Sequence, residues 1–174
     1  RDRGHDRAPH PWRGRDHGFH NARSDDGDAF PTGHAVLDAE LPEAGWPRGA
    51  LTEILSDYPG QGELRLLIPS LRQLTQDQQY VALINPVWIP YAPALTSAGV
   101  DLSYVISVGP LDKADHLWTL EQVLRSGHCR AVLAWPDRDL STKELRRLQL
   151  AAEAGKSSGF LFRSSQMKQQ NSPA

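Results

Sequence analysis

Five short, continuous apolar runs, separated by segments with helical spacing, constrain the fold of this chain more than any other feature. The runs cover residues 50–56, 80–85, 104–109, 131–135 and 159–163 and are rich in Val, Ile, Leu and aromatic residues. Runs without polar alternation are typical of strands buried on both faces, as in a parallel sheet. The segments between them carry apolar residues at steps of three and four, which indicates helices. The sequence therefore predicts an α/β fold with a doubly wound, mainly parallel sheet and helices on both faces.

Capping residues mark two of the predicted helices. Asp112 is placed to begin a helix that Gly127 would end. Ser141 and Glu144 have the spacing of a capping box, and Gly155 is the expected C-terminal signal of that second helix. Both helices therefore have a predicted start and a predicted end.

The helices after the first two runs are less regular. The leucines from Leu64 to Leu74 fall on one face of a helix, but Pro69 within it predicts a kink. A shorter helix is expected from about Pro90 to Ala98, ending at Gly99.

The length of 174 residues suits one domain with tails. Residues 1–29 hold six Arg, six Asp and four His with almost nothing apolar, so this segment is predicted to be disordered. Residues 30–164 form the predicted domain, and residues 165–174 a polar tail. A metal site at His17 and His20 is not predicted, because no cysteine partner or fixed scaffold surrounds them.

Composition narrows the class of protein. Nineteen Lys and Arg against 21 Asp and Glu give a formal charge of −2, so no global positive field indicates nucleic acid or an anionic membrane. The single cysteine, Cys129, excludes an intramolecular disulfide and is expected to be a buried thiol. No transmembrane run or secretory signal is visible, which favours a cytoplasmic protein.

The stretch SDYPGQGEL, residues 56–64, stands where a phosphate-binding loop would stand, between a strand and a helix. Such a loop needs glycines, a lysine for the outer phosphates and a Ser or Thr for magnesium. Gly62 precedes the lysine position, but Glu63 replaces the lysine and Leu64 the hydroxyl residue. A carboxylate there would repel a triphosphate. A tight structural turn containing Gly60 and Gly62 is the simpler interpretation.

The flanks of this loop resemble a known family. PTGHAVLDAELPEAGWPRGALTEIL, residues 31–55, is similar to the stretch before the phosphate loop of RecA-type recombinases. Residues 80–106 and 120–135 are similar, in the same order, to later strands and helices of that core. The resemblance implies a RecA-like, P-loop NTPase-like fold.

Within the RecA-like group, GWPRGALTEIL, PYAPAL, WPDRDLSTKELRRLQLAAEAG and GFLFR most resemble ImuA, which is related to SulA. The resemblance covers residues 31–163. It implies an SOS-response accessory protein of translesion DNA synthesis and mutagenesis, a scaffold that binds an ImuB-type Y-family polymerase homologue, a DnaE-type polymerase and RecA. The alternative is a SulA-like cell division inhibitor that binds FtsZ, and a third hypothesis is a nucleotide-dependent enzyme with an unusual loop.

Four positions at which the RecA family has ATPase residues are replaced here: Glu63, Leu64, Val87 and Trp135. The resemblance therefore implies no hydrolysis, no catalytic residue and no cofactor. Asp137 and Asp139 follow the fourth strand and are alternatives for metal binding, but surface acids in such a loop are commonplace.

Aromatic residues are the first candidates for partner binding, because they are enriched at interface hot spots. Trp88 and Tyr91 are expected in the loop and helix start after a strand, where open α/β sheets place ligands. Trp118 and Trp135 are further candidates for exposed anchors, although Trp118 is expected to pack in the core.

Arginines near the capping box are the second group of candidates. Arg138, Lys143, Arg146 and Arg147 could contact DNA phosphates, and Arg146 and Arg147 are retained as partner-binding candidates. Acidic residues interleave with them, which favours a solvated face with local ion pairs. Direct DNA contact stays open at this point.

Overall fold

The computed structural model describes residues 27–57, 62–87 and 91–165. Most of the two predicted tails, as well as Gly60 and Trp88, lies outside these ranges. In the described part of the chain, no helix is long and apolar enough to cross a membrane.

The core is a five-stranded parallel sheet, which confirms the predicted α/β class. Its strands are β3 (Leu51–Ser56), β4 (Tyr80–Ile84), β5 (Val105–Val108), β6 (Cys129–Ala134) and β7 (Ser158–Ser164). They are ordered β3-β7-β6-β4-β5, and every neighbouring pair is parallel. Each strand overlaps one of the five apolar runs, whereas the finer RecA-like assignment stays a prediction.

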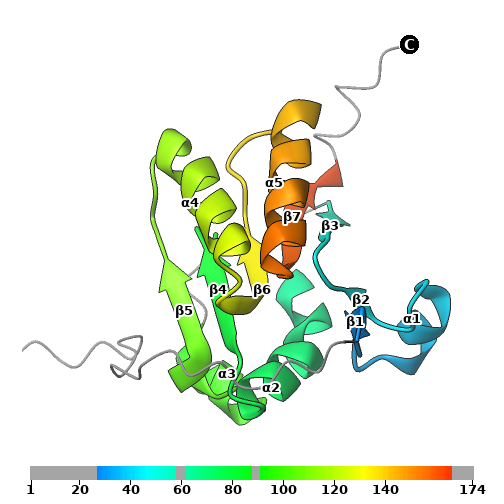
Figure 1. Cartoon of the computed structure of the whole chain (residues 1–174). Coiled ribbons are helices and arrows are strands. Elements are labelled where there is room, and N and C mark those ends of the chain that lie inside the picture. Colours follow the sequence, from blue (N-terminus) through cyan, green and yellow to red (C-terminus); the bar gives the residue numbers. More distant parts are fainter. Residues whose placement is uncertain (1–26, 58–61, 88–90, 166–174) are drawn as a thin grey trace, which may run out of the picture.

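Helices cover both faces of this sheet. Alternate strand residues point to opposite faces, so Val81 and Leu83 join one buried cluster and Ala82 and Ile84 another. The first cluster includes leucines of α2 (Ile68–Gln76) and α3 (Ala92–Ser97). The second includes residues of α4 (Lys113–Ser126) and α5 (Thr142–Gly155). Figure 1 shows α4 and α5 packed side by side across the front of the sheet.

The ends of α4 and α5 follow the predicted signals in part. Gly127 ends α4 in the left-handed conformation with φ 69°, and Asp112 occupies the N-cap position without a side-chain capping bond. Ser141 and Glu144 form the predicted capping box. Gly155, the expected C-terminal signal, is the last residue of α5, but Lys156 takes the left-handed C-cap position with φ 50°.

The predicted kinked helix over residues 64–74 is instead two elements. A 3₁₀ turn, η1 (Glu63–Leu66), precedes α2, and Pro69 lies in the first turn of α2. Proline has no N–H to donate, and the first turn of a helix is where that loss costs least. Pro69 therefore begins a helix here and does not kink one.

The N-terminal part of the domain packs against α2. Strands β1 (Ala29–Phe30) and β2 (Trp46–Pro47) pair antiparallel, and α1 (Ala35–Glu40) lies between them in the sequence. Elsewhere in the chain, a short 3₁₀ helix, η2 (Leu102–Tyr104), precedes β5. Trp46 donates its indole N–H to Ser70 Oγ at 3.1 Å, and Ser70 Oγ donates to the carbonyls of Pro31 and Thr32. This buried network ties residues 31–47 to α2.

Candidate functional site

Glu63 and Trp135, two of the four positions that the sequence analysis compared with RecA-type ATPase residues, contact each other. Gly62, with φ 110°, leads into η1, and the Glu63 carboxylate accepts a hydrogen bond from Trp135 Nε1 at 3.4 Å. Trp135 is 6 % exposed and stacks on Phe162 with ring centroids 4.6 Å apart. The interpretation of Trp135 as an exposed anchor is therefore wrong. Val87 is 49 % exposed.

A buried arginine on β7 forms ion pairs with two carboxylates, one on β3 and one in the loop after β6. Arg163 on β7 is 8 % exposed and donates to Glu53 at 2.8 Å and to Asp139 at 2.7 Å. Burial alone would lower the pKa of Arg163, but its bonds to the two carboxylates raise that pKa above the ordinary value. Asp139, an alternative metal ligand in the sequence, is thus an ion-pair partner. Within the described ranges, no group of three or more His, Cys, Asp or Glu residues is arranged to hold a metal ion.

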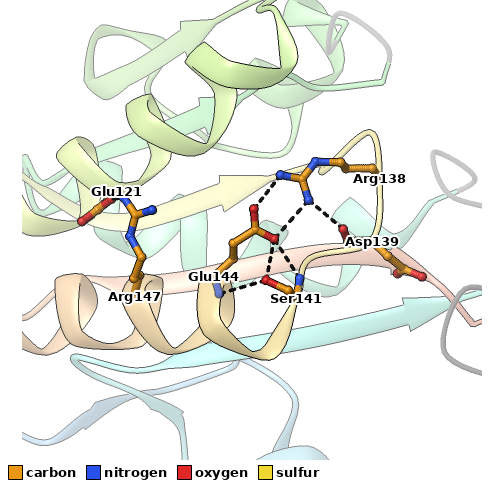
Figure 2. Close-up of polar contacts among 6 residues, drawn as sticks. All are labelled: Glu121, Arg138, Asp139, Ser141, Glu144 and Arg147. Carbon is orange, nitrogen blue, oxygen red and sulfur yellow. Dashed lines mark hydrogen bonds and ion pairs between the residues drawn. The ribbon is translucent and has the colours of Figure 1, made fainter. Parts of the chain in front are cut away.

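Two arginines at α5, Arg138 before it and Arg147 within it, are paired with acids; Figure 2 shows both. Arg138 donates both terminal nitrogens to the Glu144 carboxylate, at 3.1 and 2.6 Å, and Glu144 also accepts from the backbone N–H of Ser141 at 2.8 Å. These bonds, the one to Arg138 first, lower the pKa of Glu144 to about 2. Arg147 reaches across to Glu121 on α4. The local pairing favoured by the sequence is therefore present.

An apolar groove lies between the start of α2 and α3. It has a volume of about 420 Å³ and is lined by Leu64, Arg65, Ile68, Pro69, Tyr91, Ala94, Leu95 and Ala98. Tyr91 is 72 % exposed, whereas Leu95 is buried and anchors α3 to the core. We call this feature the α2–α3 groove.

The far end of α3 is fixed to α2 by hydrogen bonds. Gln76 donates to the carbonyl of Gly99 at 3.1 Å, and Thr75 Oγ1 accepts from the N–H of Asp101 at 3.0 Å. Thr75 is fully buried, so this bond satisfies a hydroxyl that water cannot reach. The groove is therefore bounded by two helices whose spacing is fixed.

The sequence-predicted candidates do not form one surface. Tyr91 lines the α2–α3 groove, whereas Arg146 and Arg147 lie on α5, which covers the opposite face of the sheet. Trp118 on α4 is 62 % exposed, so the prediction that it packs in the core is wrong. Trp88 lies outside the described residues.

The sequence did not predict the α2–α3 groove or the hydrogen bond from Trp135 to Glu63. The lining residues come from two separate segments, 64–69 and 91–98, and no local motif joins them. For Trp135 a signal existed, because Ala131, Leu133 and Trp135 alternate along β6 and its end, and all three belong to one buried cluster.

The fold and the site define a class: a parallel-sheet α/β domain with an apolar groove on one face of the sheet. Residues 49–159 match the family model described as "Cell division inhibitor SulA". The chain therefore belongs to the SulA family. It is 33 % identical over 137 residues to the cell division inhibitor SulA of Cronobacter sakazakii, covering 78 % of this chain and 77 % of that protein.

A second relative and a solved structure also support membership of the SulA family. The chain is 32 % identical over 117 residues to the cell division inhibitor SulA of Klebsiella aerogenes, covering 66 % of this chain and 69 % of that protein. The crystal structure of SulA from Pseudomonas aeruginosa is similar with a TM-score of 0.55 and 26 % identity, over 66 % of this chain and 98 % of that one.

The ImuA interpretation is wrong, and the match to the SulA family overturns it. The motifs that carried it build the core: GFLFR lies in β7, and the Ser-Thr-Lys-Glu stretch begins the capped helix α5. The lead-in over residues 31–55 is also structural, because Thr32 donates its N–H to Asp38 at 2.9 Å and Trp46 donates to Ser70. Such motifs build the fold and do not by themselves identify the family. ImuB-type and DnaE-type partners have no support.

Proposed function

We propose that this chain inhibits bacterial cell division during the response to DNA damage, by binding FtsZ in the cytoplasm and blocking its polymerisation. The observation that carries this proposal is the match of residues 49–159 to a family of cell division inhibitors. The mechanism is binding and not catalysis, since a complex that occupies FtsZ surface keeps it from its next subunit.

The α2–α3 groove is the surface we assign to FtsZ. Its lining is apolar apart from Arg65, and Tyr91 stands exposed at its side. An exposed aromatic beside an apolar groove with one arginine has the composition of an interface hot spot. Truncating such a residue costs about 2 kcal/mol, which is roughly a 30-fold loss of affinity. Arg146 and Arg147 are not assigned to this interface, because α5 lies on the other face of the sheet.

The test is GTP-dependent polymerisation of FtsZ from the same organism, followed by light scattering and by sedimentation while the chain is titrated. The parent chain is expected to suppress polymer near equimolar concentration. Tyr91→Ala is expected to need roughly 30-fold more protein for the same effect.

Trp118→Ala is the matched control. Trp118 is also a large exposed aromatic residue, but it lies on α4, away from the groove. The Trp118→Ala variant should inhibit FtsZ polymerisation as the parent chain does. Polymerisation that continues with the parent chain in large excess would refute the proposed function, and equal losses in the two variants would refute the assignment of the groove.

A further inference from the structure

Trp135 is held rigidly at the end of β6. Its backbone N–H donates to the carbonyl of Ile84 at the end of β4, at 3.2 Å. Its indole lies against Phe162 of β7, with rings 15° from parallel. At 6 % exposure the side chain has little surface left for a partner. Trp135 thus packs against the end of the sheet and is not part of a binding surface.

Its indole N–H points to the one turn that forms a wall of the groove. The N–H donates to Glu63, the first residue of η1, and the next two residues, Leu64 and Arg65, line the α2–α3 groove. The contact therefore joins the rigid sheet edge to the groove wall across 72 residues of sequence.

The wall has weak local support. A single 3₁₀ turn has poor hydrogen-bond geometry and is marginal alone. Gly62 precedes it with φ 110° and gives no side-chain cap. The contacts that reach the turn from elsewhere include Trp135 at its start and His34 Nε2, which lies 3.2 Å from the carbonyl oxygen of Leu66 at its end. Tertiary contacts of this kind set where Leu64 and Arg65 stand.

We propose that Trp135 is a positioning residue for partner binding, which holds η1 through Glu63 and so preorganises the wall of the α2–α3 groove. For the effect on FtsZ, this rests on the proposed function. Without the bond, the wall is less ordered in the free chain, and part of the binding free energy is spent on ordering it. At 3.4 Å the bond is long, so the expected loss of affinity is modest, roughly 5- to 10-fold.

The test uses Trp135→Phe, which keeps a ring against Phe162 and removes the N–H donor. FtsZ affinity and the urea midpoint of the chain are measured together. Phe160→Leu is the stability control, because Phe160 is buried against Trp46 and has no bond to η1. Trp135→Phe should weaken FtsZ binding roughly 5- to 10-fold, and Phe160→Leu should leave affinity unchanged despite an equal or larger fall in the midpoint.

Two further variants test whether the effect passes through Glu63. Glu63→Gln keeps a side-chain carbonyl that can accept from the indole, so it should retain more affinity than Glu63→Ala. If both residues act through one bond, the double variant with Trp135→Phe and Glu63→Ala should bind FtsZ no more weakly than Glu63→Ala alone. Parent-like affinity in Trp135→Phe, or full additivity of the two changes, would overturn the proposal.

Amide hydrogen exchange separates this inference from the proposed function, because it needs no FtsZ. The N–H of Arg65 bonds to the Gly62 carbonyl at 2.9 Å and that of Leu67 to the Leu64 carbonyl at 3.0 Å. Trp135→Phe should speed exchange at these two amides and leave those of α4 unchanged. If the parent fails to bind FtsZ, faster exchange still supports the positioning role of Trp135, and unchanged exchange overturns it.

Discussion

Replacing Gly155 by alanine sets two effects of opposite sign against each other. Alanine is favoured over glycine in a helix by at most about 1 kcal/mol, and less at its last residue. The added methyl carbon, however, would lie 1.9 Å from the carbonyl oxygen of Leu124 and 3.0 Å from the carbonyl carbon of Arg125. Both atoms belong to the backbone of α4, so no side-chain rotation relieves the overlap.

The free-energy cost of the steric clash should exceed the gain in helix propensity. Overpacking typically costs about 1–3 kcal/mol, and an overlap with backbone at 1.9 Å belongs at the upper end. Subtracting the gain in helix propensity leaves a destabilisation of about 2 kcal/mol. For a chain of this size that corresponds to a fall in Tm of roughly 4–8 °C.

Thermal and urea unfolding followed by far-UV circular dichroism measure this change. Ala154→Gly is the matched control, because Ala154 is exposed in the same turn and its substitution tests helix propensity without a clash. It should lower stability by at most about 1 kcal/mol. A Tm of Gly155→Ala at or above that of the parent would show that α4 and α5 do not approach as closely as described.

Three further predictions concern titratable groups. Burial, opposed by Asp137 and reinforced by Arg138, lowers the pKa of His116 below 6.5. The folded state therefore favours neutral histidine, and stability should fall as the pH drops below 6.5, with a flatter urea-midpoint profile in His116→Gln. Since the pKa of Glu144 is lowered from 4.5 to about 2, its contribution should persist above pH 4.5 and disappear as the pH falls toward 2; Glu144→Gln should lack this part of the acid-unfolding profile. Burial raises the pKa of Cys129 to about 11, so a thiol reagent at pH 8 should label the chain only after denaturation.

The sheet was predictable because its signal is local and redundant. β4 and β6 are buried over nearly their whole length, so each reads as a continuous apolar run. The capping box of α5 was predictable for a related reason, since Ser141 and Glu144 need only each other and the backbone. Gly155 was assigned to the right helix for the wrong reason, because its role depends on how closely α4 approaches, and a sequence does not show that distance.

The tryptophans show where periodicity fails. On α4 the inward positions hold His116, Leu120 and Glu121, while Trp118 lies two residues from His116 and faces outward. Polar groups inside and an indole outside reverse the usual pattern, so hydrophobicity placed Trp118 in the core. Glu121 tolerates its position because Arg125 and Arg147 both bind its carboxylate. These pairings come from two helices and become visible only in the folded chain.

The function was harder to predict than the fold for a reason rooted in chemistry. A catalytic site demands fixed residue types at fixed spacing, and a sequence can therefore be compared with such a pattern position by position, as was done for Glu63 and Trp135. A docking groove demands only shape and apolar surface, and the proposed one, the α2–α3 groove, draws these from two segments with a strand between them. Many residue combinations satisfy such a demand, so the groove leaves no motif. The family is consequently identified by similarity over most of the domain, here over residues 49–159, and not by the short motifs that build the strands and helices.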